Sequence, residues 1–372
     1  MKSIVRGFVS SPPVGSRVVA LDGLRGFAIG LVLARHALPA QIGGGGFAGV
    51  DLFFVLSGFL ITTLLIEEHT KSGHIMLGKF YARRALRLLP ALYFMLAVYA
   101  VVLLVFAPAA KDHLSWLGFA AVYATPFAQW NGAEIAPGLG VVWSLAVEEY
   151  FYFLWPLLFM AMLALKLPKT ARYAIPVALA ILFMAIRVAT WFQHGTRIYE
   201  MPWTWIDGLL AGCLTAMLWK GGLIKKVPAW AYWSAFTLIV AFSFFPNAKG
   251  ATFTYVVALP LLAVCSAIVV ASLVTSSNSK LAALLTFRPL RWLGTRSYAI
   301  YLWNAIFLSA AKPFEIARPL EVGGGIVLSL LIAEISFRLV EKPALKYKKR
   351  FERASMTTNE VESNLISAPA VS

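Results

Sequence analysis

Two ionisable residues, Arg25 and His36, lie eleven positions apart in one apolar stretch of the sequence. Eleven residues make about three helical turns, so both side chains fall on one helix face, roughly 16 Å apart along the axis. Ionisable groups are costly at bilayer depth, so we expect this face to line a protein cavity. A neutral imidazole can act as a general base toward a hydroxyl, and a guanidinium can bind phosphate or carboxylate. The alternatives are an interfacial histidine and an Arg25–Asp22 ion pair.

Two adjacent carboxylates, Glu148 and Glu149, stand near the start of another apolar segment, in W-S-L-A-V-E-E-Y-F-Y (143–152). Consecutive helix residues point about 100° apart, so at most one of the two faces a cavity squarely. A carboxylate on the His36 side of the membrane would orient the imidazole or stabilise its protonated form. The alternative is a solvated helix start, where acidic residues interact with the positive end of the helix dipole.

A basic cluster, Arg83, Arg84 and Arg87, lies between the second and third apolar segments. On a helix Arg83 and Arg87 share one face and Arg84 lies beside them. Such a compact set of guanidinium groups suits the phosphates of a nucleotide-containing donor. The alternative is a cytoplasmic anchor that contacts lipid headgroups.

The elements that must position these residues are membrane-length apolar segments of about twenty residues. They lie near 21–39, 50–66, 90–108, 141–165, 174–192, 203–219, 229–246, 252–274, 297–311 and 323–341. The sequence therefore predicts an all-α, polytopic transmembrane helix bundle of about ten spans. Asp51, at the start of the second segment, is expected to cap a helix. Arg187 and Asp207 are candidates for an ion pair across the bundle, although no spacing requires it.

Composition and charge agree with this class of protein. Hydrophobic residues make up 60% of the 372 and charged residues only 13%, far from the balance of a soluble domain. The net charge of +16 does not indicate nucleic-acid binding, because the basic residues cluster at alternate connections between apolar segments. This pattern places the N and C termini in the cytoplasm. We expect a cytoplasmic segment over 1–16, a transmembrane domain over 17–345 and a disordered cytoplasmic tail over 346–372. Cys213 and Cys265 are expected to be packing residues.

Six motifs, taken in order, resemble the acyltransferase-3 family of integral-membrane acyltransferases, and the resemblance covers nearly the whole chain. The motifs are L-D-G-L-R-G with the histidine that follows (21–36), G-V-D-L-F-F-V-L-S-G-F-L-I (49–61), F-Y-A-R-R-A-L-R-L-L-P (80–90), W-S-L-A-V-E-E-Y-F-Y (143–152), G-T-R-S-Y-A-I-Y-L-W (294–303) and F-R-L-V-E-K-P (337–343). Each motif is weak alone, and the six in register are specific.

The resemblance implies an O-acyltransferase that moves an acyl group, acetyl by default, from cytoplasmic acyl-CoA to a hydroxyl of a cell-envelope or secreted carbohydrate. It implies a multi-pass protein of the bacterial inner (plasma) membrane, surrounded by lipids, with acyl-CoA as co-substrate, a carbohydrate or lipid-linked glycan as acceptor, and no metal. His36 then maps to the catalytic base and Arg25 to its partner in the first span. Arg83, Arg84 and Arg87 map to a contact with the coenzyme A phosphates, and Glu148 and Glu149 to the acidic element. Direct transfer and an acyl-enzyme both remain open.

Two departures from the family pattern stand out. The family's ninth span usually ends Y-L-x-H, whereas this chain has Asn304, which cannot carry a proton. The fourth-span motif has Ala146 and Tyr150 where the family more often has serine and glutamine. The main alternative is a transporter or flippase that uses Asp22, Arg25 and His36 as a pathway. A third reading is a catalytically silent scaffold, and the sequence does not identify the acceptor.

Overall fold

The part of the chain that the structure describes is mostly helical. This computed structural model describes residues 18–38, 44–106, 113–276, 278–310 and 318–347, and none of them lies in a β-strand. The predicted all-α class is therefore confirmed. The predicted segment 1–16 and nearly all of the predicted tail 346–372 lie outside the described residues, so the domain boundaries stay predictions.

In the described part of the chain, seven helices form the long elements of the bundle. They are α2 (Val19–Ala37), α3 (Ala48–Ser72), α4 (Leu77–Phe106), α7 (Val142–Ala164), α8 (Lys169–His194), α11 (Leu259–Thr275) and α15 (Arg318–Ser336). Shorter α-helices lie between them: α5 (Leu114–Ala121), α6 (Thr125–Trp130), α9 (Ile206–Lys220), α10 (Ala229–Ser243), α12 (Lys280–Leu285), α13 (Arg288–Thr295) and α14 (Ser297–Ala310). Three 3₁₀ turns, η2 (Gly195–Glu200), η3 (Pro202–Thr204) and η4 (Ala248–Gly250), and two π-helical turns, η5 (Thr254–Ala258) and η6 (Phe337–Glu341), complete the order.

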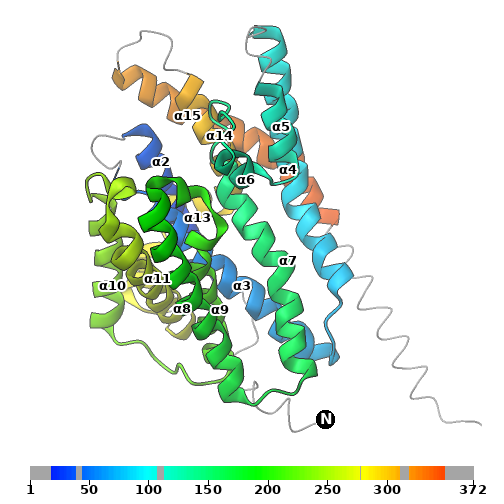
Figure 1. The fold of residues 1–372 in the computed structure, drawn as a ribbon, viewed down its shortest axis with the longest axis vertical. Helices are drawn as coiled ribbons and strands as arrows, with labels where there is room; N and C mark the ends of the chain where they lie inside the picture. The colour runs from blue at the N-terminus through cyan, green and yellow to red at the C-terminus, as the bar shows by residue number, and fades with distance from the viewer. Residues whose placement is uncertain (1–17, 39–43, 107–112, 277, 311–317, 348–372) are drawn as a thin grey trace, which may run out of the picture.

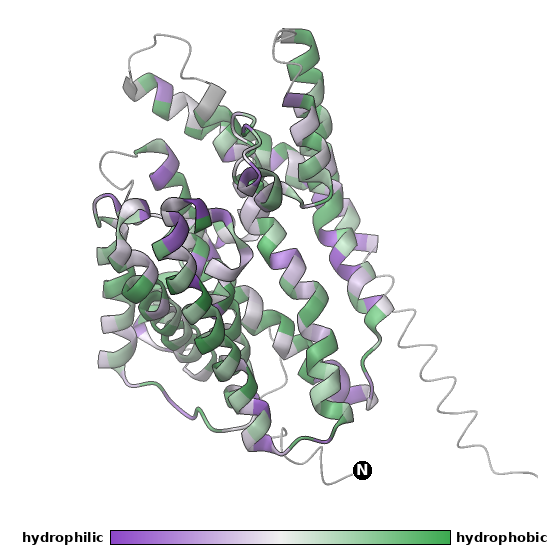
Figure 2. Cartoon of the chain, in the orientation of Figure 1, coloured by the Kyte–Doolittle hydropathy of each residue, from purple (hydrophilic) through white to green (hydrophobic). Residues whose placement is uncertain are grey.

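Helix α3 is the central element of the bundle. It packs against α2, α7, α9 and α11, so it contacts helices from both halves of the chain. In Figure 1, α8 to α11 lie together on one side of α3, and α4 with α5 forms the opposite edge. Figure 2 shows hydrophobic residues along the lengths of the long helices, with hydrophilic residues interrupting them at a few points.

Among the described residues, six helical segments are long and apolar enough to cross a bilayer. They are Ala48–Ser72, Leu77–Val105, Val142–Ala164, Lys169–Glu200, Thr254–Thr275 and Leu320–Tyr347. Two shorter apolar helices, Ala229–Ser243 and Ser297–Leu308, coincide with further predicted spans. Each of the ten predicted segments overlaps a helix. A multi-pass membrane protein is thus supported, whereas the count of about ten spans and the cytoplasmic termini remain predictions.

Glycine residues bring α2 into close contact with the end of α12 and with α13. A Cβ atom on Gly23 would lie 1.6 Å from the Leu285 carbonyl oxygen, and one on Gly26 would lie 1.8 Å from that of Leu290. On the facing helix, a Cβ on Gly294 would lie 1.7 Å from the Asp22 oxygen. This is the small-residue packing expected of membrane helices. This backbone contact fixes the position of α2, and with it Arg25 and His36, relative to the segment that leads into α14.

The predicted capping role of Asp51 is wrong. Helix α3 begins at Ala48, and no side chain caps its first turn. Asp51 instead lies within the helix, 1% exposed, and accepts a hydrogen bond of 3.5 Å from Ser266 Oγ on α11. The helix starts earlier than the sequence indicates because Gly44 to Phe47 already form a turn. Cys213 and Cys265 are both buried free thiols, as expected of packing residues.

Candidate active site

Five helices enclose a cavity that contains four of the predicted site residues. It has a volume of about 180 Å³ and lies between α2, α3, α4, α7 and α14. Arg25, Arg84, Arg87 and Glu148 supply its charged lining. Leucines from α3 and α4 supply much of the apolar lining. We call this space the arginine cavity.

Arg25 is held in the arginine cavity by the start of α14. Its Nε and Nη2 atoms donate hydrogen bonds of 3.3 and 3.1 Å to Ser297 Oγ. Asp22, one turn away, lines a separate surface pocket with Arg288 and Arg291. The contact with Ser297 keeps the guanidinium turned toward the bundle interior, where it can bind an anion or a carbonyl oxygen.

The predicted basic cluster divides between two environments. Arg84 lines the arginine cavity and lies over the Tyr152 ring at 4.0 Å, a cation–π contact. Arg87, one turn on, lines the same cavity. Arg83 forms a salt bridge of 2.8 Å with Glu68 of α3 and does not line the cavity. The structure therefore brings two of the three arginines together with Arg25.

The adjacent glutamates also separate. Glu148 lines the arginine cavity, where it accepts hydrogen bonds from Ser57 Oγ at 2.7 Å and from the Tyr152 hydroxyl at 3.4 Å. Glu149 does not line this cavity. The negative charge of Glu148 thus partly balances the positive charge of the arginines, and its carboxylate offers a hydrogen-bond acceptor inside the cavity.

His36 lies in a different space, further along α2. This second pocket has a volume of about 330 Å³ and is lined by Trp143, Tyr199, Glu200 and Lys249, among others. We call it the histidine pocket. Lys249 pairs with Glu200 at 3.0 Å and lies over the Tyr199 ring at 4.3 Å. Aromatic walls with a few charged groups suit a polar organic ligand.

The imidazole of His36 meets α14 rather than the arginine cavity. Its Nδ1 atom is hydrogen-bonded to Asn304 Oδ1. Asn304 is fully buried, whereas His36 is partly exposed and lines the pocket. The position at which the chain departs from the resembled family is therefore in direct contact with the candidate base.

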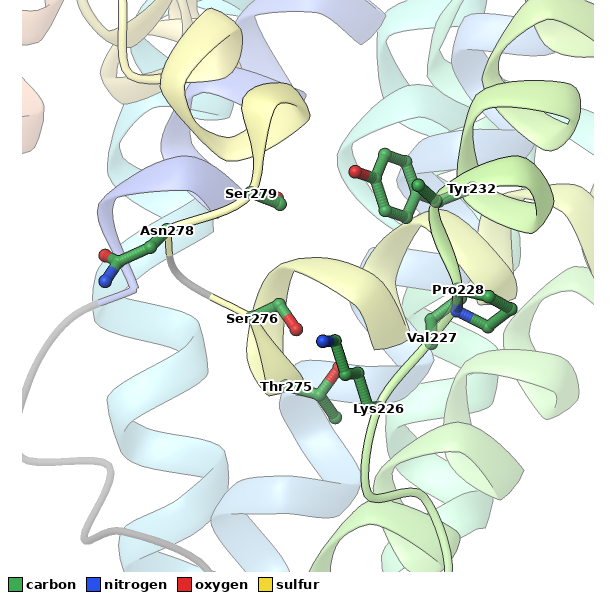
Figure 3. Close-up of a pocket in the computed structure, with 9 residues that line it drawn as sticks. Lys226, Val227, Pro228, Tyr232, Thr275, Ser276, Asn278 and Ser279 are labelled. Carbon is green, nitrogen blue, oxygen red and sulfur yellow. The ribbon is translucent and has the colours of Figure 1, made fainter.

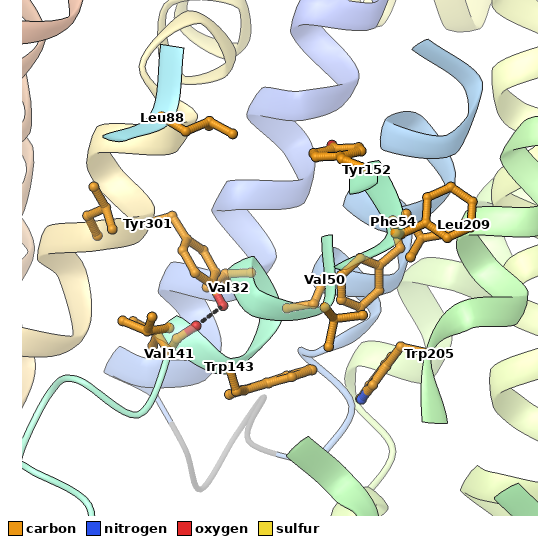
Figure 4. Packing of buried hydrophobic residues seen from close by; sticks show 14 of the residues in the cluster. Val32, Val50, Phe54, Leu88, Val141, Trp143, Tyr152, Trp205, Leu209 and Tyr301 are labelled. Carbon is orange, nitrogen blue, oxygen red and sulfur yellow. Dashed lines mark hydrogen bonds between the residues drawn. The ribbon is translucent and has the colours of Figure 1, made fainter. Parts of the chain in front are cut away.

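A small hydrogen-bond cluster separates the two spaces. Ser144 and Tyr301 line the arginine cavity, and Val141 lines the histidine pocket. The Tyr301 hydroxyl donates to the Val141 carbonyl at 3.0 Å and lies 2.5 Å from Ser144 Oγ. Figure 4 shows the Tyr301 hydroxyl turned toward Val141. Tyr152 and Leu88, which line the arginine cavity, lie on the opposite side of the Tyr301 ring in this view. The residues around the start of α7 and one tyrosine of α14 thus form the partition.

Several residues that contact the predicted site residues have no role that the sequence alone indicates. Ser297, Tyr301 and Asn304 contact Arg25, Ser144 and His36 respectively. Their spacing of i, i+4 and i+7 is that of one helix face, a signal that a periodicity reading of 294–304 can detect. Ser57, which donates a hydrogen bond to Glu148, has no comparable local signal because most of the α3 residues that line the cavity with it are apolar.

Two further surface pockets lie away from this site. One, of about 820 Å³, is formed by the connection before α10 and the end of α11, with Lys226, Thr275 and Ser276 in its lining (Figure 3). The other, of about 310 Å³, contains Asp22, Arg288 and Trp292. None of the other predicted site residues lines either pocket.

Comparison with known proteins gives one family over most of the chain. A profile described as an acyltransferase domain matches residues 18–337. The chain is 31% identical over 359 residues to the peptidoglycan O-acetyltransferase OatA of Listeria monocytogenes, covering 88% of this chain and 56% of that protein. It is also 31% identical over 349 residues to the O-acetyltransferase OatA of Staphylococcus aureus, covering 88% and 57%. The chain therefore spans little more than half the length of these relatives. No solved structure matches it.

Proposed function

The chain belongs to the acyltransferase domain family, and from that premise we propose that it is a membrane O-acyltransferase acting on cell-wall carbohydrate. The donor is an acyl-CoA, with acetyl as the default group, and the acceptor is a sugar hydroxyl. Peptidoglycan is the first acceptor to test, because the relatives include a peptidoglycan O-acetyltransferase. The observation that carries the proposal is the pair of spaces, one rich in arginine and one holding His36, on either side of the Ser144–Tyr301 contact.

The chemistry of the arginine cavity fits the acyl end of the donor. Arg25, Arg84 and Arg87 supply cations for a phosphate or a thioester carbonyl oxygen, and neighbouring leucines supply an apolar wall. Drug-sized ligands occupy about 300–1,000 Å³, so a cavity of about 180 Å³ holds only part of a coenzyme A. We therefore place the acyl-pantetheine end inside the cavity and the nucleotide outside it.

The histidine pocket fits the acceptor. Tyr199 and Trp143 offer flat apolar surfaces, and Glu200 and Lys249 offer hydrogen-bond partners for hydroxyl groups. His36 lies in the same pocket and can take a proton from a bound hydroxyl. Under the predicted topology this pocket faces the outer side of the bacterial plasma (inner) membrane, where cell-wall glycans are accessible.

The proposed reaction passes across the partition. The acceptor oxygen attacks the carbonyl carbon of the thioester while His36 removes the hydroxyl proton. The new ester C–O bond forms, the C–S bond breaks, and the thiol of coenzyme A leaves after it receives the proton. The arginines bind the donor on their side of the partition and hold its thioester end toward His36. Glu148 accepts hydrogen bonds from Ser57 and Tyr152, and its negative charge partly balances the positive charge of these arginines.

The test is mass spectrometry of cell-wall glycans from cells that express the wild type, His36→Ala or Arg84→Ala at matched protein levels. We expect an acyl mass increment with the wild type and its loss in both variants. Arg338→Ala is the matched control, because Arg338 is 70% exposed and pairs only with Glu334 within its own helix in the described contacts. It should keep the increment.

Two outcomes contradict the proposal. Glycans with the same acyl content in all four strains, together with no turnover of labelled acyl-CoA in membranes, would favour the transporter alternative. An increment that survives His36→Ala would remove the candidate base from the reaction.

A further inference from the structure

The side-chain amide of Asn304 has only one orientation that satisfies its surroundings. Its Nδ2 atom lies 2.9 Å from the Ile300 carbonyl oxygen and 2.7 Å from the Tyr301 carbonyl oxygen. Both partners are acceptors, so the atom that faces them must be the amide nitrogen, which has two protons to donate. The reversed amide would place an oxygen against two carbonyl oxygens in a fully buried position, which costs free energy. The Oδ1 atom is therefore the one that faces His36.

An amide oxygen can only accept a hydrogen bond. Since Asn304 Oδ1 is hydrogen-bonded to His36 Nδ1, the proton on Nδ1 must be supplied by the histidine. We infer that Asn304 is a positioning residue that holds neutral His36 in the tautomer with its proton on Nδ1 and its lone pair on Nε2. The inference concerns the same site as the proposed function and, for its catalytic consequence, rests on it.

The tautomer decides which nitrogen can act as the base. With Nδ1 protonated, Nε2 accepts the proton of the acceptor hydroxyl, and Nδ1 stays anchored to α14 before and after the transfer. The hydrogen bond also becomes stronger when the imidazole is charged, because hydrogen bonds from a charged donor are stronger than those between neutral groups. Asn304 therefore supplies orientation, and part of the stabilisation, that a carboxylate supplies in a His–Asp pair, without adding a buried charge.

Other ionisable groups also act on His36. Arg35 lies on its own helix, Tyr199 and Glu200 on η2 and Lys249 on η4, and all four line the histidine pocket. These groups are unchanged in variants of Asn304, so a difference between such variants reports on position 304.

The first experiment measures the tautomer directly in the wild-type protein. The full-length protein is labelled with ¹⁵N-histidine and reconstituted in nanodiscs, and the ring-nitrogen NMR signals are recorded over a range of pH. The chain has five histidines, so His36→Gln identifies the signals of His36 by their loss. We expect a protonated Nδ1 and an unprotonated Nε2 in the neutral form. The opposite pattern overturns the inference, whatever the enzyme activity.

The second experiment uses two substitutions with opposite expected shifts. Asn304→Asp keeps the acceptor for Nδ1 and adds negative charge, so the acidic limb of the pH–rate profile for acyl transfer should move to higher pH. It also loses the two hydrogen bonds to the Ile300 and Tyr301 carbonyl oxygens, so the protein should be less stable. Asn304→Leu removes the acceptor, so the limb should move to lower pH and the plateau rate should fall at least tenfold. A purely structural role would lower the plateau without moving the limb in opposite directions, and that result overturns the inference.

The matched control is Asn131→Ala. In the wild type, Asn131 is exposed and its side-chain amide also donates to a helical carbonyl oxygen, that of Phe127. Its pH profile should equal that of the wild type. The two hypotheses fail separately. Absence of acyl transfer by the wild type would refute the proposed function, whereas active wild type with the unexpected tautomer would refute only the role of Asn304.

Discussion

Arg187 of α8 and Asp207 of α9 form an ion pair of 2.8 Å in the interior of the bundle. The Arg187 side chain is fully buried, and it also donates to the Tyr255 and Thr204 carbonyl oxygens at 2.8 Å each. The predicted pairing of Arg187 with Asp207 is thus confirmed. These residues line neither the arginine cavity nor the histidine pocket, so they tie helices together beside the site.

Removing one partner of this pair should destabilise the protein strongly. Arg187→Met leaves Asp207 as a buried charge without its cation, and such changes cost about 3–5 kcal/mol. The double variant Arg187→Met, Asp207→Leu should recover much of the loss, because both charges are then absent. The midpoint of thermal unfolding in detergent measures both effects. A double variant that is less stable than Arg187→Met would contradict this explanation.

Arg84→Ala should weaken donor binding. A hydrogen bond to a charged group contributes about 1.5–3 kcal/mol, which corresponds to about a 10- to 100-fold rise in KM for the acyl-CoA. The measurement is steady-state transfer from labelled acetyl-CoA by protein in nanodiscs. Arg338→Ala is measured in parallel as the control and should keep the wild-type KM. An unchanged KM would place the donor outside the arginine cavity.

Tyr301 should control the size of the acyl group. Its ring and hydroxyl form part of the partition between the arginine cavity and the histidine pocket. Tyr301→Ala shortens the side chain, so we expect the ratio of butyryl to acetyl transfer to rise. Tyr301→Phe keeps the ring and should keep the wild-type ratio. Competition between the two acyl-CoA donors gives this ratio in one reaction, and equal ratios in all three proteins would exclude Tyr301 as the determinant.

Glycines on α2 should differ sharply in their tolerance of a methyl group. Gly26→Ala places a Cβ 1.8 Å from the Leu290 carbonyl oxygen, so α13 must move, and overpacking of this kind costs about 1–3 kcal/mol. Gly30 has no heavy atom within 4 Å of the same position, so Gly30→Ala should be tolerated. Size-exclusion profiles after heating compare the two proteins. Equal loss in both would show that the α2–α13 contact does not determine stability.

Local patterns in the sequence identify the helices and the residues that share a helix face. The apolar runs predict helices at all ten segments, and the spacing of Arg25 and His36 predicts that they lie at different depths of one helix. Both follow because helical periodicity and hydrophobicity depend on neighbours within a few residues. Gly23 and Gly26 contact the backbone of neighbouring segments, whereas Gly30 faces open space, although all three lie on one helix.

The partners of these residues depend on contacts between segments far apart in the chain. Arg83 and Arg84 are adjacent, yet one pairs with Glu68 and the other enters the arginine cavity. Glu148 joins the arginines, and His36 meets Asn304, which is 268 residues away. No local pattern encodes such pairings, because they are set by which helix faces pack together and how far each side chain reaches. The sequence by itself therefore determined the helices, the family resemblance and the candidate residues, and only the tertiary packing decided that those candidates occupy two separate spaces.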